Sequence, residues 1–417
     1  MAWLKHTYAT QLPASLYSVQ APQPVSHPQM ALYNEALANE LGIAEHLKDA
    51  EKALAYLSGN ETVAGSQAIS QAYAGHQFGH FTRLGDGRAV LLGEVETPHG
   101  LYDLQLKGSG LTPYSRRGDG RATFYSILRE YLVSEAMHAL YVPTSRSLAV
   151  VKTGDRVYRE RIHEGAVLTR VAASHIRVGT FEYARFLGED GDLKALLDYT
   201  IQRHYPELAD SANPALALLE AVMHKQWDLI VNWLRVGFIH GVMNTDNMSI
   251  AGETIDYGPC AFMNAYHPGT VFSSIDTRGR YAFSKQPNIA YWNLGVLANA
   301  LLPLIDEAEE AAAEKAKAVL DEFPEHFSKA YFEMMGNKLG IVQQAEEDRG
   351  LVEMIMDILT KQKVDYTNFF TALRRDGELI NELKQEAAFE RWHAKWEKAR
   401  SREIGRASCR ERVYTKV

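Results

Sequence analysis

A strand hairpin followed by one amphipathic helix is the feature of this sequence that most limits its possible folds. Residues 88–96 (RAVLLGEVE) form a predicted strand, a turn follows at Pro98–Gly100, and residues 101–107 (LYDLQLK) alternate apolar and polar side chains as a second strand does. Residues 123–140 then carry apolar residues at helical spacing. From about residue 165 the pattern becomes mainly helical. This order predicts an α+β fold of two lobes, a strand-rich N-lobe with one key helix and a mainly helical C-lobe.

The same change of pattern gives the predicted domain boundaries. Residues 1–165 are assigned to the N-lobe with an N-terminal extension. Residues 166–400 are assigned to a helical C-lobe, which contains the segments HGVMNTDN and IDYG described below. Residues 401–417 (SREIGRASCRERVYTKV) resemble a translated sequencing adapter, and we interpret them as a non-native tail.

Shorter elements are predicted from periodicity and from capping and turn residues. They are a helix at 29–41, strands at 148–151 and 156–161, a helix at 215–235 opened by Asn213 and Pro214, two small strands at 248–250 and 254–255, and helices over 290–400.

Composition excludes several classes of protein. The net charge of -8 argues against a general nucleic-acid binder, and two cysteines are too few for a disulfide framework or a Cys-rich zinc site. The longest apolar run, Leu294–Ile305, is shorter than the roughly 20 residues that a membrane-spanning helix needs. The N-terminus lacks the pattern of a signal peptide. We expect a cytoplasmic monomer with no nucleic-acid and no membrane partner.

A glycine turn and a lysine bracket the predicted hairpin. Gly85-Asp-Gly-Arg88 precedes its first strand, as in a glycine-rich lid over phosphates, although an ordinary turn has the same composition. Lys107 ends its second strand, and Glu130 follows on the predicted helix. A strand lysine paired with a helix glutamate holds the nucleotide phosphates in protein kinases. Glu135 is an alternative partner. Lys107 could also pair with neither glutamate and extend into solvent.

The strongest local signal is the segment HGVMNTDN, residues 240–247, followed by IDYG at 255–258. In kinases a catalytic loop supplies an Asn to the metal, and an Asp-x-Gly after a short hairpin supplies the second ligand. Asn247 and Asp256 are the corresponding oxygen donors, which suit Mg²⁺. Turns rich in Asn, Asp and Gly are the alternative reading, but all these pieces occur here in kinase order.

Two arginines and two histidines are further candidates. Arg170 and Arg177 are seven residues apart and would share a face if their segment were helical, which would suit phosphate oxygens. From the residues alone, two surface arginines are the favoured interpretation. His76 and His80 have the spacing of a zinc-binding helix, but the glycines beside them argue against a helix. We interpret these histidines as structural or substrate-facing.

Together these segments resemble the selenoprotein O (SelO) family from about residue 30 to about residue 400. The resemblance rests on YAGHQFGHFTRLGDGR, LQLKGSGLTPYSRRGDGRA, the helix with Glu130, LTRVAASHIRVGTFEYAR and HGVMNTDNMSIAGETIDYGP. It implies a protein-kinase-like fold, first taken for a pseudokinase, that binds ATP in a flipped orientation. The activity it implies is protein adenylylation: AMP passes from ATP to protein hydroxyls, and pyrophosphate leaves.

The resemblance also implies roles for individual residues. Nucleotide-binding positions are Gly85, Gly87, Arg88, Lys107, Asp119, Gly120, Arg170, Arg177 and Asp256. Lys107 would pair with Glu130, and Asn247 and Asp256 would bind Mg²⁺, or Mn²⁺. Val242 stands where kinases carry the catalytic Asp, so Asp246 is the expected proton acceptor.

Alternatives to this activity remain open from the sequence. One is a nucleotide-binding pseudokinase that acts as a scaffold. Another is transfer of UMP from UTP with Mn²⁺. The expected partners are ATP and proteins that offer Ser, Thr or Tyr hydroxyls. Some family members carry a redox-active C-terminal Cys or selenocysteine, and the tail beyond residue 400 departs from that pattern.

Overall fold

The computed structural model describes residues 3–341, 348–375 and 378–407. It is a mixed α and β structure that divides into two compact units. Unit 1 comprises Met1–Leu229, Val242–Gly258 and Ile289–Asp321, and unit 2 comprises Ile230–Gly241, Pro259–Asn288 and Glu322–Val417. The predicted lobe boundary after residue 165 stays a prediction, although one strand, Ile162–Ala172, continues through it.

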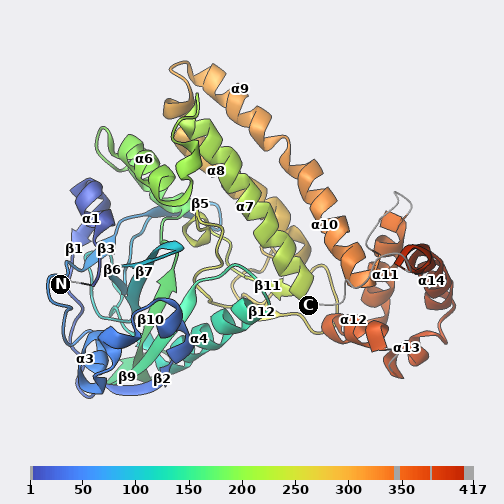
Figure 1. Ribbon diagram of the computed structural model, residues 1–417, viewed down its shortest axis with the longest axis horizontal. Coiled ribbons are helices and arrows are strands. Elements are labelled where there is room, and N and C mark those ends of the chain that lie inside the picture. Colours follow the sequence, from blue (N-terminus) through green and yellow to red (C-terminus); the bar gives the residue numbers. More distant parts are fainter. Residues whose placement is uncertain (1–2, 342–347, 376–377, 408–417) are drawn as a thin grey trace. The chain divides into compact units, whose positions relative to one another are not determined.

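An antiparallel sheet forms the centre of unit 1 (Figure 1). Its strands run in the order β1 (Tyr17–Val19), β3 (Ile69–Gln71), β6 (Ala89–Thr97), β7 (Gly100–Lys107), β10 (Ile162–Ala172), β9 (Arg146–Tyr158) and β2 (Gln29–Tyr33), with β8 (Ala122–Thr123) paired to β10. The hairpin predicted from the sequence is β6–β7, and it is confirmed.

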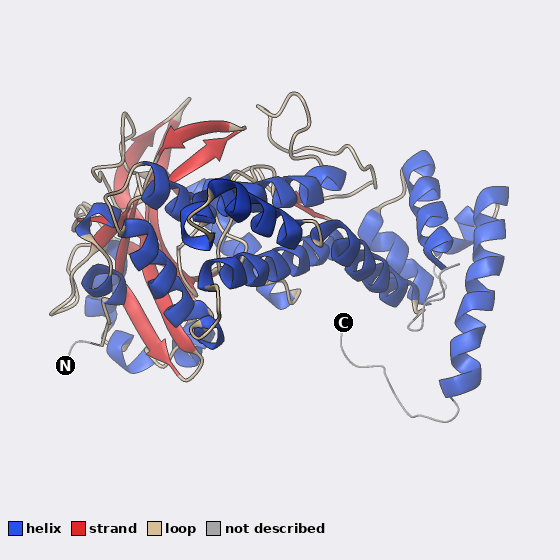
Figure 2. Cartoon of the chain, turned by 90° about the horizontal axis from the view of Figure 1, so that it is seen from above, coloured by secondary structure: helices blue, strands red, loops and turns tan. Residues whose placement is uncertain are grey.

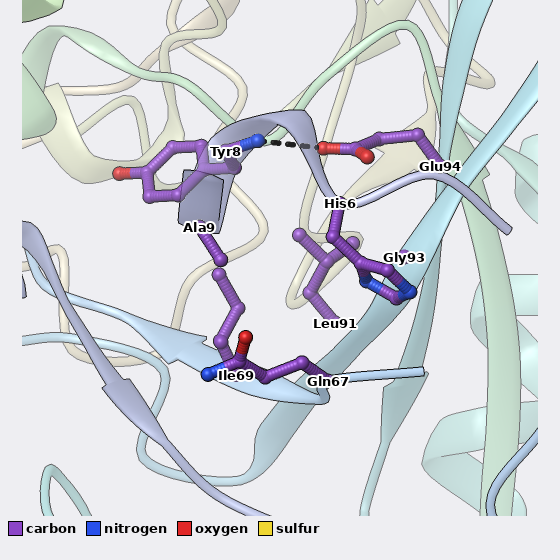
Figure 3. A pocket seen from close by; sticks show the side chains of 8 residues that line it. All are labelled: His6, Tyr8, Ala9, Gln67, Ile69, Leu91, Gly93 and Glu94. Atoms are coloured by element: carbon purple, nitrogen blue, oxygen red, sulfur yellow. Dashed lines mark hydrogen bonds between the residues drawn. The ribbon is translucent and has the colours of Figure 1, made fainter. Parts of the chain in front are cut away.

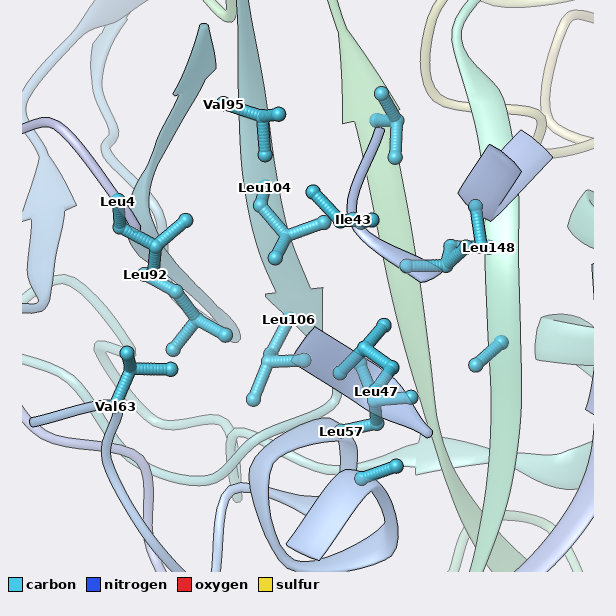
Figure 4. Close-up of a cluster of buried hydrophobic side chains, with 14 of the residues drawn as sticks. Leu4, Ile43, Leu47, Leu57, Val63, Leu92, Val95, Leu104, Leu106 and Leu148 are labelled. Atoms are coloured by element: carbon cyan, nitrogen blue, oxygen red, sulfur yellow. The ribbon is translucent and has the colours of Figure 1, made fainter. Parts of the chain in front are cut away.

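The alternation in β7 separates an apolar face of the sheet from a polar one. Leu104 and Leu106 are buried in a hydrophobic cluster with Leu92 on β6 and Leu57 on α3 (Ala50–Ser58), as Figure 4 shows. Burial of each such leucine contributes about 2 kcal/mol to the stability of the folded state. The intervening side chains of β7 point to the opposite face, because the side-chain period of a strand is two. Lys107 is thereby directed to that polar face.

The helix after the hairpin is also confirmed. It is α4, Phe124–Ala139, and Thr123 caps it by accepting a hydrogen bond from the backbone N–H of Ser126 at 3.2 Å. Helix α7 (Pro214–Val236) starts as predicted, because Asn213 Oδ1 accepts the N–H of Leu216 at 3.1 Å.

The predicted helix at 29–41 is wrong over its first half. Residues Gln29–Tyr33 form the edge strand β2, which pairs with β9, and only Glu35–Glu40 form a helix, α2. Asn34 lies between them and caps α2. Apolar residues three and four apart gave the helical signal, but pairing with an available sheet edge overrides that preference.

Two strand predictions also need correction. The separate strands expected at 148–151 and 156–161 are one continuous strand, β9, and the chain then turns at residues 159–161 into β10. The small strands expected at 248–250 and 254–255 do not pair with each other. Ser249 instead bridges to Arg177, and Thr254 bridges to Thr144.

The remaining helices agree with the helical second half of the sequence prediction. They are α5 (Val178–Phe186), α6 (Asp192–His204), α8 (Gln286–Ile305), α9 (Glu309–Leu320), α10 (Phe323–Leu339), α11 (Arg349–Gln362), α12 (Tyr366–Arg375), α13 (Glu378–Leu383) and α14 (Ala387–Ala407). The short N-terminal helix α1 (Thr7–Gln11) has no counterpart in the sequence prediction.

Unit 2 consists mostly of the helices α10 to α14; all helices are blue in Figure 2. Its described part also contains a short ladder between β11 (Phe238–Ile239) and β12 (Ala261–Phe262). The indole N–H of Trp392 donates to Leu351 O at 2.9 Å, which ties α14 to α11. Of the predicted non-native tail, residues 401–407 continue α14, and residues 408–417 lie outside the described part of the chain.

One segment, Phe283–Ile305, is long and apolar enough to cross a membrane by length and composition. Just over half of its most apolar window, 56%, is buried inside the protein, and buried core helices pass the same test. The cytoplasmic location and the lack of a membrane partner stay predictions.

Candidate active site

Lys107 and Glu130 form a buried ion pair between the sheet and α4. Lys107 Nζ lies 2.6 Å from Glu130 Oε2, and the side chains are 10% and 3% exposed. The alternative partner, Glu135, instead binds Arg146, whose Nη2 lies 2.8 Å from Glu135 Oε2. The structure therefore selects Glu130 from the two glutamates that the sequence left open.

Asp256 is the point on which three cationic side chains converge. Lys107 Nζ lies 2.9 Å from its Oδ1, and Arg170 Nη1 lies 2.6 Å from the same oxygen. Arg177 Nη1 lies 3.4 Å from Oδ2. Burial disfavours the charged carboxylate, but the three cations outweigh it and hold the pKa of Asp256 well below its usual range.

The backbone of Asp256 is itself unusual. Its φ is +59°, in the left-handed region that few residues other than glycine and Asn or Asp enter. Such strain persists where surrounding contacts impose it. Here the ion pairs with Lys107 and the two arginines fix the side chain.

The expectation that Arg170 and Arg177 share a helix face is wrong. Arg170 lies on β10, beside Gln105 of β7, and Arg177 is the N-cap residue of α5. Both side chains are at most 2% exposed. The chain turns between β10 and α5, and this turn brings both guanidinium groups to Asp256. The two arginines are therefore neighbours although no helix carries both.

Buried donors in this cluster remain unused. Arg170 Nε and Arg177 Nη2 are buried and have no hydrogen-bond partner among the described residues. An unsatisfied buried donor is costly, and bidentate guanidinium groups suit phosphate oxygens. The arrangement therefore fits an anionic ligand.

Asp246 lies beside this cluster, in the short 3-10 turn Thr245–Asn247. Its backbone carbonyl accepts a hydrogen bond from Arg177 Nη1 at 3.2 Å. The side chain is buried, and its Oδ1 has no hydrogen-bond partner among the described residues. Burial raises the pKa of Asp246 to about 6, although Arg177 opposes the shift. A carboxylate with a free oxygen and such a pKa is suited to accept a proton near neutral pH.

Asn247 is oriented by its own loop. Its Nδ2 donates to Val242 O at 2.9 Å, which fixes the amide plane and leaves Oδ1 as the oxygen available to a cation. In the described part of the chain no three His, Cys, Asp or Glu side chains gather as a metal site. A cation held by Asn247 and Asp256 would therefore need phosphate or water oxygens as its other ligands, which is how Mg²⁺ usually binds with nucleotides.

The first Gly-Asp-Gly-Arg segment packs against the turn that contains Tyr114 and Ser115. A Cβ on Gly85 would lie 2.4 Å from the ring of Tyr114, so the glycine is required by this packing. Ser115 Oγ donates to Gly87 O at 2.5 Å, and Arg88 is exposed. The nucleotide contacts of Gly85, Gly87 and Arg88 stay predictions.

The second Gly-Asp-Gly-Arg segment lies elsewhere in unit 1. Asp119 forms a two-pronged ion pair with Arg159, at 2.7 and 2.9 Å, and this hydrogen bonding lowers the pKa of Asp119. A Cβ on Gly120 would lie 2.0 Å from Gly110 O. The structure places Asp119 against Arg159 instead of in the cluster around Asp256, and the nucleotide contacts of Asp119 and Gly120 stay predictions.

Asp86 and Gln105 belong to the cluster but were missed in the sequence. Gln105 accepts from Arg170 Nη2 at 2.6 Å and donates to Asp86 at 3.1 Å. Burial raises the pKa of Asp86 to about 6. The period-two pattern of β7 puts Gln105 on the same face as Lys107, and that signal could have identified it.

A small pocket beside β6 is separate from these residues. His6, Tyr8, Ile69, Leu91 and Glu94 are among the residues that line it, and Glu94 accepts the N–H of Tyr8 at 3.0 Å (Figure 3). None of the predicted site residues lines it. Its contacts attach the N-terminal segment to the sheet.

Comparison with known proteins settles the family. The family model described as "Protein adenylyltransferase SelO" matches residues 3–410. The chain belongs to the SelO family. It is 52% identical over 399 residues to the protein nucleotidyltransferase YdiU of Halalkalibacterium halodurans. The alignment covers 95% of this chain and 81% of that protein.

Two further relatives give the same result. The proteins of the same name from Brevibacillus brevis and Alcanivorax borkumensis are each 53% identical over 388 residues. These alignments cover 93% of this chain and 79% and 80% of the two relatives. This SelO-family chain is therefore an enzyme, a protein nucleotidyltransferase with a nucleotide as its substrate, and the scaffold alternative is not supported.

Proposed function

We propose that this enzyme transfers AMP from ATP to Ser, Thr or Tyr hydroxyls of proteins and releases pyrophosphate. The observation that carries the proposal is the convergence of Lys107, Arg170 and Arg177 on Asp256, next to Asp246. Three buried cations suit the phosphates of a nucleotide, and a carboxylate with an unpaired oxygen suits proton removal from a hydroxyl.

We also propose that the fold is the two-lobed protein-kinase-like one. Its support is the Lys107–Glu130 pair, which joins a strand of the hairpin to α4 as a kinase lysine and glutamate do. The order of Asn247 and Asp256 along the chain adds to it.

In the proposed mechanism each residue has one task. Arg170 and Arg177 neutralise the phosphates and the departing pyrophosphate, and Glu130 holds Lys107 in place for the same purpose. Asp246 takes the proton of the acceptor hydroxyl, whose oxygen attacks the α-phosphorus as the bond to pyrophosphate breaks. Asn247 and Asp256 would hold Mg²⁺, or Mn²⁺, which would supply further positive charge at the phosphate oxygens.

Labelled nucleotides test the proposal directly. Protein label is expected from α-labelled ATP and not from γ-labelled ATP, and the Asp246→Asn variant is expected to lose it. Label from γ-labelled ATP alone would show an ordinary kinase. Since the relatives' names do not specify the base, competition between ATP and UTP, with Mg²⁺ and with Mn²⁺, decides between AMP and UMP.

A further inference from the structure

A group of aromatic side chains, three exposed and one partly buried, lies beside the proposed catalytic turn. We call it the aromatic platform, and it comprises His76, Phe81, Phe186 and Trp292. The ring of His76 lies 5.5 Å from that of Phe81 and 5.4 Å from that of Trp292, and Phe81 lies 5.9 Å from Phe186. Phe81 and Phe186 are 42% and 44% exposed. Contiguous exposed apolar surface of this kind marks sites of interaction.

The platform is attached to the turn that carries Asp246. The backbone N–H of His76 donates to Thr245 Oγ1 at 2.7 Å, and that of Phe78 donates to Asn244 Oδ1 at 3.1 Å. Gly75, which precedes His76, is so close to Asp246 that a Cβ would lie 2.6 Å from its Oδ1. His76, a member of the platform, therefore directly follows the residue that packs against Asp246, the proposed base.

The platform is also attached to α5. Phe81 lies on a two-stranded hairpin, β4 (Ala74–Gln77) and β5 (His80–Arg83), which is not part of the main sheet. An isolated hairpin is marginally stable, so its position depends on other contacts. His76 Nδ1 is hydrogen-bonded to the fully buried carboxylate of Glu182 on α5. This bond fixes the hairpin to α5, whose last residue is Phe186.

The border of the platform carries positive charge. Arg83 lies two residues after Phe81 on the same strand face, and Arg185 precedes Phe186; both are exposed. The guanidinium of Arg185 lies 5.5 Å from the centre of the Phe186 ring. A polypeptide that binds here should offer an apolar side chain to the rings. It should not carry a cluster of basic residues, because the two arginines would repel them.

We propose that the aromatic platform binds the acceptor polypeptide through an apolar side chain near the hydroxyl that receives the nucleotide. This proposal rests on the proposed function, because the acceptor must bring its hydroxyl to Asp246. Phe81 and Phe186 then determine which acceptor sites are used, and they take no part in the chemistry.

The test uses the full chain and a set of acidic peptides with one Ser each. In one series a single Phe is moved through the three positions on either side of the Ser, and in the reference peptide glycine fills those positions. The variants are Phe81→Ala and Phe186→Ala. The matched control is Tyr125→Ala on α4, another exposed aromatic of unit 1, which is 74% exposed.

The wild type is expected to prefer the peptides with Phe at one or two positions through a lower KM. Each platform variant is expected to raise the KM for those peptides about tenfold, as the loss of a buried apolar contact does. The KM for ATP and the KM for the glycine peptide should not change, and Tyr125→Ala should behave as the wild type. If both platform variants still prefer the Phe peptides over the glycine peptide as the wild type does, the proposal is overturned. A changed KM for ATP would overturn it in favour of a nucleobase stacked on the platform.

Peptide binding separates this proposal from the proposed function. Anisotropy of the labelled Phe and glycine peptides, measured with a non-hydrolysable ATP analogue, reports on the platform without catalysis. If the wild type transfers no AMP but binds the Phe peptide more tightly than Phe81→Ala does, the proposed reaction fails and the platform stands. Equal binding by the wild type and both variants would overturn the platform.

Discussion

Gly75 lies directly against the carboxylate of Asp246, so that a Cβ at this position would be 2.6 Å from Oδ1 and 2.9 Å from the Cβ of Asp246. The contact explains why a glycine precedes His76 in a strand, where glycine is otherwise unfavourable. The backbone of β4 thereby limits where the Asp246 side chain can lie.

The Gly75→Ala substitution is expected to displace the Asp246 carboxylate and to slow nucleotide transfer. A misplacement of about 1 Å costs roughly a hundredfold in rate, so kcat should fall by about that factor while the KM for ATP stays the same. Gly295→Ala on α8 is the matched control, because nothing lies within 4 Å of its added Cβ. Steady-state kinetics of both variants checks the prediction, and an unchanged kcat for Gly75→Ala would contradict it.

The choice of Glu130 over Glu135 can be tested by a pair of variants. Glu130→Gln removes a charged hydrogen bond to Lys107 and should raise the KM for ATP about tenfold, since such bonds contribute about 1.5–3 kcal/mol. Glu135→Gln alters the hydrogen bonds with Arg146, Asn34 and Ser147, and it should leave the KM for ATP unchanged. Equal effects of the two variants would show that the pair with Glu130 has no role in nucleotide binding.

Local patterns predicted the hairpin and α4 because each depends on residues close in sequence. The pairing of Lys107 was expected from the kinase arrangement, with Glu130 and Glu135 both open as partners. Strand alternation placed Lys107, and helical spacing placed Glu130 on α4. Such signals do not identify the partner of a strand edge. The local pattern therefore predicts a helix over Gln29–Tyr33, although these residues pair with β9.

The candidate site shows the same limit for long-range contacts. The spacing of Arg170 and Arg177 predicts a shared face only for a helical segment. The turn between β10 and α5 instead brings both arginines to Asp256. The aromatic platform gave no signal of its own, because Phe81 and Phe186 are far apart in sequence. The hairpin that carries Phe81 is held to α5 by the hydrogen bond between His76 and Glu182, which no local pattern reveals.

Removal of the charge at Asp256 is expected to destabilise the fold as well as to stop nucleotide transfer. Asp256→Asn leaves Lys107, Arg170 and Arg177 buried without their common anion, and loss of one partner from a buried ion cluster costs about 3 kcal/mol. Urea denaturation measures this loss. Asp119→Asn is the matched control, because its pair with Arg159 is 43% and 40% exposed and should contribute less than about 1 kcal/mol. A loss for Asp256→Asn no larger than that of the control would contradict the central position of Asp256.

Asp86 is expected to make the stability of the protein depend on pH. Burial raises its pKa from 3.8 to about 6, so the folded state binds this proton more strongly than the unfolded state does. The contribution is favourable below pH 4 and is lost as pH rises from about 4 to about 6, because the ionised carboxylate is the form that burial penalises. A shift of this size corresponds to about 3 kcal/mol.

The Asp86→Asn variant isolates this effect, because an amide does not titrate and its oxygen can still accept the N–H of Gln71. The free energy of unfolding of the wild type, minus that of the variant, should fall by about 3 kcal/mol between pH 4 and pH 7. Denaturant titrations at several pH values measure the difference, and Asp210→Asn, at an exposed position, controls for the loss of a surface carboxyl. A difference that stays constant over this range would show that Asp86 is ionised in the folded protein throughout, and that Arg177 and Gln105 compensate for its burial.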